Sequence, residues 1–114
     1  MIDLVRLAAG QRHEQGLEHR VIAALRTIHD PELPVNIYDL GLIYDLAVDE
    51  AGRVDIRMTL TAPGCPVAQR FPAQVEQAVA EIEGVTSAHV EIVWDPPWDP
   101  SRMSEAARLQ LGLA

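Results

Sequence analysis

The stretch LIYDLAVDEAGRVDIRMTLT, residues 42–61, decides the fold of this chain. Apolar and polar residues alternate over 42–48 and again over 54–61, which is the pattern of two strands that each bury one face. The intervening residues 49–53 include Gly52, the glycine of a short hairpin loop. The sequence therefore predicts an antiparallel β-hairpin at the centre of the chain.

Helical periodicity flanks the hairpin on both sides. Between Glu14 and Asp30, apolar residues recur at spacings of three and four, as on the buried stripe of a helix. The members of this stripe are Leu17, Val21, Ile22, Leu25 and Ile28. A second stripe follows the hairpin and is closed by Gly84, a residue typical of helix ends. Its members are Val67, Phe71, Val75, Ala78, Val79 and Ile82.

Prolines shape the connections between these elements. Pro31 cannot continue the helical hydrogen-bond ladder, so the first helix ends at Asp30 and residues 30–36 form an ordered, non-helical loop. Pro72 leaves two alternatives for the second helix. Either the chain makes one turn after Pro66 and restarts near Pro72, or one continuous helix is kinked there.

A third strand is predicted over residues 88–94, where apolar and polar residues alternate once more. The proline-rich residues 94–101 exclude regular structure, and Ser101 or Ser104 can cap a short final helix through Leu111. Helix, hairpin, helix and strand in this order predict an α+β two-layer sandwich with a small mixed sheet.

Composition excludes several classes of protein. The 114 residues and their 48% apolar content suit one domain with one core. A net charge of −8 with nine scattered arginines argues against nucleic-acid binding. Lysine is absent, which excludes a lysine Schiff base or phosphate clamp. The first twenty residues lack the apolar run of a signal peptide, and no stretch approaches the roughly 18 apolar residues of a membrane span, so we expect a cytoplasmic protein.

Cys65 is the only cysteine, which rules out an internal disulfide. It lies in TLTAPGCP, residues 59–66, between the second predicted strand and the second predicted helix. Backbone N–H groups and the helix dipole at such a junction favour the thiolate, the form that attacks electrophiles and binds soft metals. The alternative is a small buried apolar residue.

Polar residues gather around this cysteine in the predicted fold. Because the hairpin returns the chain, the start of its first strand lies beside the end of its second. The first loop and the Cys65 turn are therefore expected to be neighbours, which predicts a site for a metal or a sulfur-containing ligand. The candidate supporting residues are Asp30, Glu32, Asp39, Thr59 and Thr61.

Four of the five supporting residues also have a purely structural interpretation. Asp30 can begin an Asx turn, and Glu32 can be a solvated loop charge. Thr59 and Thr61 can be ordinary strand residues on the polar face.

The tail and the histidines leave further alternatives open. Trp94 and Trp98 in WDPPW, residues 94–98, can form a hydrophobic lid or a surface that binds a partner protein. A thiol enzyme using Cys65 with His29 or His89 as base is a further reading, but nothing in their spacing requires a triad. The spacing of these residues therefore gives no support to a catalyst.

Three segments together resemble the SufT/PaaD-like family of iron-sulfur cluster assembly factors, also described as metal-sulfur cluster biosynthesis factors. They are DPELPVNIYDLGLIY (30–44), MTLTAPGCP (58–66) and WDPPW (94–98). The resemblance spans residues 17–112, which we expect to be a single domain, with residues 1–16 an N-terminal extension. It implies a small α+β fold like other iron-sulfur scaffold domains, commonly in a homodimer. It also implies a carrier or accessory factor in the maturation of iron-sulfur proteins, rather than a catalyst.

The resemblance also implies roles for individual residues. Cys65 corresponds to the family's cysteine, the candidate contact for a cluster or persulfide, and Asp30 and Glu32 match its acidic loop. Thr59 and Thr61 match the polar residues that lead into the cysteine turn. The phenylacetate-pathway branch typically adds a cysteine-rich, zinc-binding tail, and no cysteine follows Cys65 here, which favours the SufT-like branch.

Ligand counting sets the expected mechanism. A conventional iron-sulfur cluster needs four protein ligands, mainly thiolates, and one chain offers one. A labile cluster or iron could be held across a homodimer and released to client apo-proteins, with an iron-sulfur scaffold as a further partner. The alternatives are a metal-free adaptor that docks clients through Trp94 and Trp98, and a PaaD-like accessory subunit of phenylacetyl-CoA epoxidation.

Overall fold

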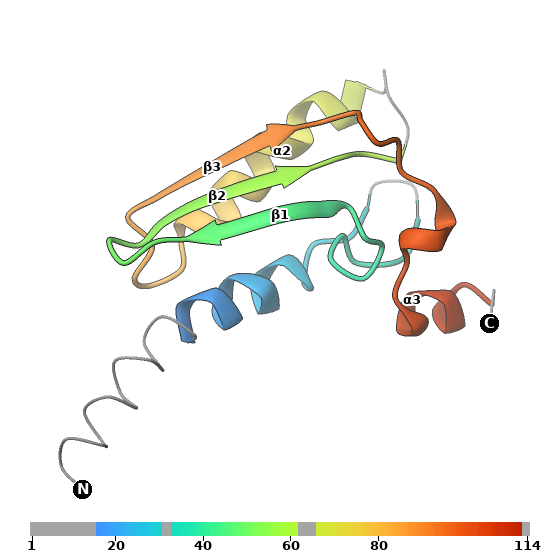
Figure 1. Cartoon of the computed structure of the whole chain (residues 1–114), viewed down its shortest axis with the longest axis horizontal. Coiled ribbons are helices and arrows are strands. Elements are labelled where there is room, and N and C mark those ends of the chain that lie inside the picture. The colour runs from blue at the N-terminus through green and yellow to red at the C-terminus, as the bar shows by residue number, and fades with distance from the viewer. Residues whose placement is uncertain (1–15, 31–32, 62–65, 113–114) are drawn as a thin grey trace, which may run out of the picture.

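The computed structural model describes residues 16–30, 33–61 and 66–112, of which 66–69 are described by their backbone alone. Its three strands are β1 (Ile43–Val48), β2 (Arg53–Met58) and β3 (Ser87–Ile92), in the spatial order β1-β2-β3 (Figure 1). The pair β1-β2 is antiparallel and the pair β2-β3 is parallel. This mixed sheet confirms the predicted α+β fold.

The second strand is shorter than its alternating pattern predicted. It ends at Met58 rather than at Thr61. Met58 is the register partner of both Ile43, where β1 begins, and Ile92, where β3 ends. In the described part of the chain, no partner strand therefore continues beside the residues that follow Met58, although the Thr59 N–H still donates to the Leu42 carbonyl at 2.9 Å.

The first helix is described over residues 16–25 and also ends earlier than predicted. The Thr27 N–H and hydroxyl both donate to the Ala24 carbonyl, at 3.0 and 2.6 Å, which tightens the last turn. The chain then forms an antiparallel bridge between His29 and Asn36. Residues just before Asp30 are thus used to brace the first loop instead of extending the helix.

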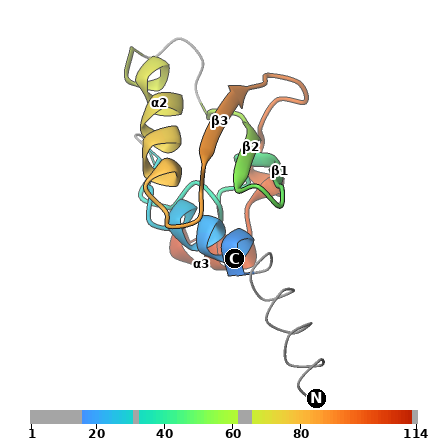
Figure 2. The ribbon, with the colours of Figure 1, turned by 90° about the vertical axis from the view of Figure 1, so that its left-hand side faces the viewer.

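The second helix, α2 (Pro66–Ala80), is continuous and contains Pro72, so the alternative of a restart at Pro72 is wrong. Gly84 follows it with a φ of +98°, consistent with the predicted helix end. Figure 2 shows α2 on one face of the sheet. Buried residues of both helices meet the inward-facing side chains of β2. They include Val21, Leu25, Phe71, Val75, Val79, Val54, Ile56 and Met58.

A short C-terminal unit closes the fold. It consists of the 3₁₀ helix η1 (Pro100–Arg102) and α3 (Glu105–Gln110). The Ser104 hydroxyl accepts a hydrogen bond from the Ala107 N–H, which confirms Ser104 as the helix cap. The Gln110 side chain donates to the Pro34 carbonyl at 3.1 Å, tying this unit to the first loop. Among the described residues, no helix is long and apolar enough to cross a membrane.

Candidate functional site

The first loop and the end of β2 meet at the end of the sheet opposite the hairpin turn. Asp30 is buried, with 7% of its surface exposed. Its Oδ2 accepts a hydrogen bond from the Leu33 N–H at 2.9 Å, and its Oδ1 accepts one from the Thr61 hydroxyl at 3.4 Å. Asp30 therefore both shapes its own loop, as its structural interpretation predicted, and reaches across 31 residues to the segment that leads toward Cys65.

Two of the predicted site residues cannot be placed. Cys65 and Glu32 lie outside the described residues. The sequence puts Cys65 four residues after Thr61 and directly before Pro66, the first residue of α2. Within the described parts of the chain, no three His, Cys, Asp or Glu side chains are grouped so that they could hold a metal ion.

Thr59 differs from the prediction that it is an ordinary residue on the polar face. It is completely buried, at 0% exposure. Its Oγ1 atom has no hydrogen-bond partner among the described residues. The strand pattern places Thr59 opposite the core-facing side chains of β2, but this position lies against the segment that follows β3 and is no longer open to solvent.

Thr59 lines a cavity of about 280 Å³ at this end of the sheet. Its walls come from the end of β2 and from the proline-rich segment after β3. The lining residues are Thr59, Leu60, Thr61, Trp94, Pro97 and Trp98. The sequence singled out the two threonines and the two tryptophans separately, and the structure brings them together.

The two tryptophans are held differently. The Trp98 indole N–H donates to the Leu40 carbonyl at 2.7 Å, and its ring is half-buried against the core. Trp94 lies beyond the end of β3 with 48% of its surface exposed. The hydrogen bond to the loop before β1 draws Trp98 inward, whereas Trp94 stays exposed.

Asp39 belongs to a separate hydrogen-bond network. Its Oδ2 accepts from the Asn36 side-chain amide at 2.8 Å, and its Oδ1 accepts from the Ser104 hydroxyl at 3.2 Å. The Arg26 guanidinium lies 4.0 Å from Oδ2 and also covers the Tyr38 ring, 4.8 Å from its centroid. These contacts join the first loop to α3, so Asp39 has a structural role that its sequence position did not reveal.

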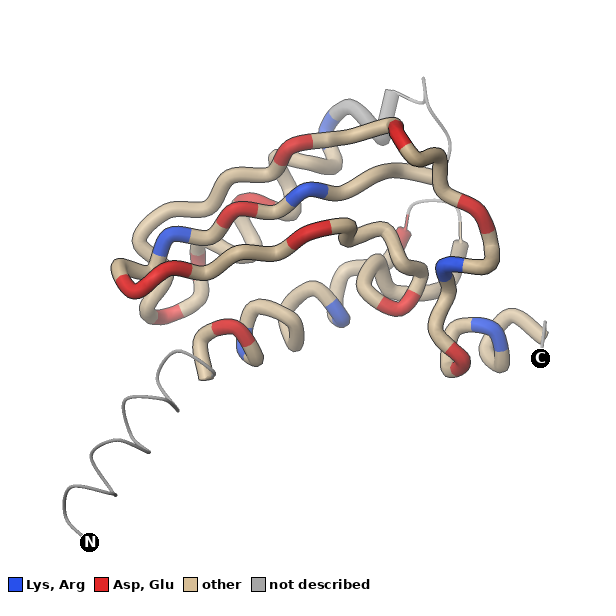
Figure 3. Tube along the Cα trace, viewed as in Figure 1, with Lys and Arg blue, Asp and Glu red and all other residues tan. Residues whose placement is uncertain are grey.

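Acidic residues lie on the segment that forms one wall of the cavity. The segment 94–99 carries Asp95 and Asp99 and no basic residue. Figure 3 marks acidic residues along the strands and this segment, with basic residues of β2 between them. The Ser101 hydroxyl and N–H donate to Asp99 and hold the pKa of that carboxyl below its usual value. Asp99 also caps η1, which fixes the C-terminal end of this segment.

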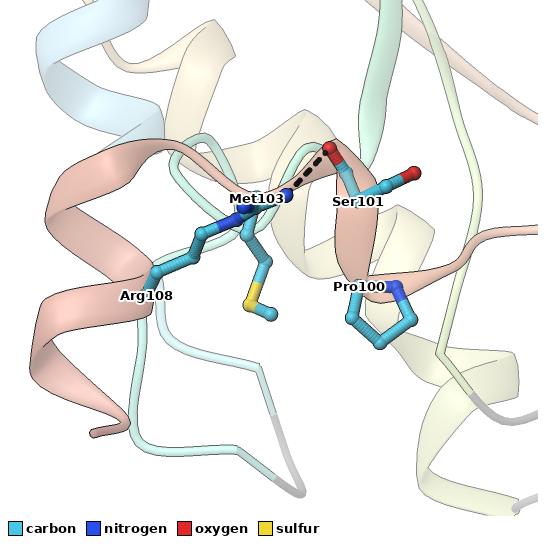
Figure 4. Close-up of a pocket in the computed structure, with 4 residues that line it drawn as sticks. All are labelled: Pro100, Ser101, Met103 and Arg108. Atoms are coloured by element: carbon cyan, nitrogen blue, oxygen red, sulfur yellow. Dashed lines mark hydrogen bonds between the residues drawn. The ribbon is translucent and has the colours of Figure 1, made fainter. Parts of the chain in front are cut away.

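Other hollows of the surface offer less chemistry. Figure 4 shows a cleft of about 290 Å³ between η1 and α3, into which Met103 and Arg108 point. The Arg108 guanidinium there donates to the Ser101 carbonyl at 3.3 Å. Two further hollows flank Tyr44, whose hydroxyl donates to the Pro96 carbonyl and whose ring lies 4.4 Å from the Arg102 guanidinium. The contacts of Arg108, Tyr44 and Arg102 thus hold the C-terminal unit in place, and Arg57 in the second hollow pairs with Glu91 at 3.6 Å.

Comparison with known proteins gives a consistent relationship. The family model described as "Iron-sulfur cluster assembly protein" matches residues 18–92. The Fe-S protein maturation auxiliary factor YitW of Bacillus subtilis is 43% identical over 88% of this chain and 98% of its own length. The Fe-S protein maturation auxiliary factor SufT of Staphylococcus aureus is 42% identical over 75% of this chain and 97% of its own length.

A solved structure shares the fold. The crystal structure of a domain of unknown function from Bacillus anthracis superimposes with a TM-score of 0.79 and is 36% identical. The match covers 91% of this chain and 99% of that domain. The family match, the SufT-named relative and the shared fold agree with the resemblance seen in the sequence motifs. The chain therefore belongs to the iron-sulfur cluster assembly protein family and is similar to its SufT members.

Proposed function

We propose that this chain is an accessory factor in the maturation of iron-sulfur proteins, in which Cys65 contacts iron or sulfur transiently and Asp30 and Glu32 complete the contact. The two relatives named above are auxiliary factors rather than catalysts, which supports a role without turnover of a metabolite. Its partners would be an iron-sulfur scaffold and client apo-proteins.

The observation that carries this proposal is the hydrogen bond between Thr61 and Asp30. It links the acidic loop to the segment that enters the Cys65 turn, although 31 residues separate the two in sequence. A carboxylate beside a thiolate gives a mixed hard and soft ligand set for iron. Thr61 would then hold Asp30 in place, and Thr59 would support the same end of the sheet from within.

The cluster in this mechanism is cargo that the protein binds weakly and passes on. Four protein ligands are usual for a stable cluster, and each chain supplies one cysteine. Two chains with two Cys65 thiolates, completed by carboxylates or a small thiol, would hold a cluster less tightly than four thiolates would. Weak binding suits a protein that must release its cargo to a client.

Anaerobic reconstitution with iron and sulfide tests this mechanism. Visible absorption and molecular mass are followed together for the wild type, Cys65→Ala and Asp30→Asn, with Asp49→Asn as the matched control at the far end of the sheet. We expect colour and a dimer in the wild type and in Asp49→Asn, no colour in Cys65→Ala, and faster loss of colour to a chelator in Asp30→Asn. Equal colour in the Cys65→Ala variant would refute the thiol contact.

The exposed Trp94 and the cavity beside it support a second candidate, a metal-free adaptor that docks clients onto the assembly machinery. The two functions differ in which substitution matters. In cells that lack the native gene, an adaptor would lose maturation of client enzymes with Trp94→Ala and keep it with Cys65→Ser. The carrier function predicts that Cys65→Ser abolishes maturation.

A further inference from the structure

A hydroxyl group beside the cavity has no hydrogen-bond partner among the described residues. The Thr59 hydroxyl is fully buried and its oxygen has no hydrogen-bond partner there. A buried polar group without a partner costs about 1–3 kcal/mol. Thr59 is among the residues that line a cavity of about 280 Å³, and its oxygen lies just behind the wall, so a small shift of the wall on binding would let an occupant supply the missing bond.

Thr61 determines which kind of polar group the cavity prefers. Its hydroxyl proton is directed at the Asp30 carboxylate, so the oxygen that Thr61 presents to its other neighbours is an acceptor. The negative charge of Asp30 behind this hydroxyl strengthens it as an acceptor. Together, Thr59 and Thr61 therefore favour a hydrogen-bond donor that carries positive charge.

The walls of the cavity favour the same occupant. Indole faces attract cations more strongly than other aromatic rings do. In the described parts of the chain, the cation-π contacts of the arginines go to Tyr38 and Tyr44, and neither tryptophan is covered by one. Trp98 is also fixed by its bond to the Leu40 carbonyl, so binding does not have to immobilise that ring.

Charge around the cavity is complementary to a cation. No arginine is among the lining residues, and Arg57, two residues before Thr59, is paired with Glu91 at 3.6 Å. The segment 94–99 carries two carboxylates, and the whole chain has a net charge of −8. An anionic ligand would meet repulsion here, whereas a basic group on a partner protein would be attracted during encounter.

We propose that this cavity receives the side chain of an arginine on a partner protein. The methylene stem packs against Trp94 and Pro97, and the guanidinium donates to the hydroxyl oxygens of Thr59 and Thr61. Arginine suits the site better than lysine because its planar group stacks on indoles, donates to two oxygens at once and is less strongly hydrated. The inference rests on the proposed partner-binding role of Trp94 and Trp98 and identifies the group that they bind.

Intrinsic fluorescence offers a direct test, because the chain has two tryptophans and both line the cavity. The full chain is titrated with acetyl-Gly-Arg-Gly-amide and with the same peptide carrying citrulline, lysine or leucine in place of arginine. Citrulline is the closest control, since it has nearly the shape of arginine without its charge. We expect a saturable change with the arginine peptide at millimolar concentration and at least tenfold weaker binding of the citrulline and leucine peptides.

Two variants locate the binding. Thr59→Val keeps the shape of the side chain and removes the hydroxyl, and we expect it to weaken binding of the arginine peptide about tenfold while the circular dichroism spectrum is unchanged. Leu109→Ala changes an apolar residue that is 61% exposed and outside the cavity, and it should bind as the wild type does.

Three outcomes would overturn the inference. Leucine or citrulline binding as tightly as arginine would make the cavity a neutral apolar pocket. No response to any peptide would make it a hydrated void, and equal binding by Thr59→Val would place the arginine elsewhere. Reconstitution of the cluster is measured independently, so normal iron and sulfide uptake without peptide binding would refute this inference and leave the Cys65 contact standing.

Discussion

The two ends of the sheet differ in how completely their polar groups are paired. At the hairpin end, Asp49 accepts hydrogen bonds from the N–H groups of Ala51 and Arg53, both at 2.9 Å, and its other oxygen accepts from the Arg53 side chain. The N–H and hydroxyl of Thr86 donate to the carbonyls of Gly52 and Ala51. The hairpin turn and the turn before β3 thus brace each other (Figure 1).

The opposite end of the sheet is held by hydrogen bonds between residues far apart in sequence, and one polar group there has no hydrogen-bond partner among the described residues. Thr61 reaches Asp30 and Trp98 reaches Leu40, which are contacts across 31 and 58 residues. Yet the Thr59 oxygen between them has no partner among the described residues, and a cavity lies beside it. Paired polar groups at the hairpin end stabilise the fold, whereas the unpaired Thr59 hydroxyl at the other end is the group to which we assign a ligand.

The largest effect is expected from Gly52→Ala at the hairpin end. Gly52 has a φ of +86°, and an added Cβ would lie 2.1 Å from the Gly84 carbonyl oxygen. The backbone strain and the clash should lower the free energy of unfolding by about 2–4 kcal/mol. Urea denaturation measures this change.

Gly16→Ala is the matched control, because an added Cβ there meets nothing within 4 Å and the residue is helical. Its effect should stay within about 1 kcal/mol. If Gly52→Ala proved as mild as this control, the bracing of the two turns would not be the source of stability that we infer.

Substitutions of Thr61 and Thr59 are expected to change the free energy of unfolding by intermediate amounts and in opposite directions. Thr61→Val removes the hydrogen bond to Asp30 and should lower the free energy of unfolding by about 1 kcal/mol. Thr59→Val replaces an unpaired buried hydroxyl with a methyl group of the same size and should raise it by about 1 kcal/mol. Thermal unfolding of both variants and the wild type measures these changes. A loss of stability in Thr59→Val would mean that the wild-type Thr59 hydroxyl is already well paired.

The smallest effect is a pH dependence that both ends share. Hydrogen bonds from the Arg53 backbone at Asp49, and from the Ser101 hydroxyl at Asp99, lower the pKa of each carboxyl below its usual value. A lowered folded-state pKa adds stability that is present above the unfolded value and is lost as the pH falls through the folded value.

Asp49→Asn and Asp99→Asn should therefore be slightly less stable than the wild type at about pH 6, with the differences shrinking toward about pH 2. Denaturation curves collected across this range provide the measurement. A difference that grew on acidification would contradict the assigned direction of the pKa shifts. Both carboxyls are exposed, so the change is small at either end.

Local patterns were enough to predict most of the fold. The alternation on either side of Gly52 predicted β1 and β2, and Ser104, one of the two serines proposed, caps α3. These features depend on residues close in sequence. The end of the first helix was misplaced because a bridge between His29 and Asn36, which periodicity does not encode, takes over the last turn.

The candidate site was predicted only in part. The nearness of the first loop to the end of β2 followed from hairpin geometry, and the contact between Asp30 and Thr61 confirms it. The burial of Thr59 and the inward position of Trp98 depend on where the segment after β3 crosses the sheet, which local pattern does not specify. The roles of Cys65 and Glu32 stay predictions.

The parallel pairing of β2 with β3 has a consequence for how such proteins diversify. Met58 and Ile92 are register partners, so the connection that carries Cys65 and the segment that carries Trp94 leave the sheet at the same level. Substitutions in the second segment can therefore change the surface around Trp94 without disturbing the ladder between the strands. If Trp94 binds partners as we propose, a lineage could change its clients there while keeping the Cys65 turn and the folding core.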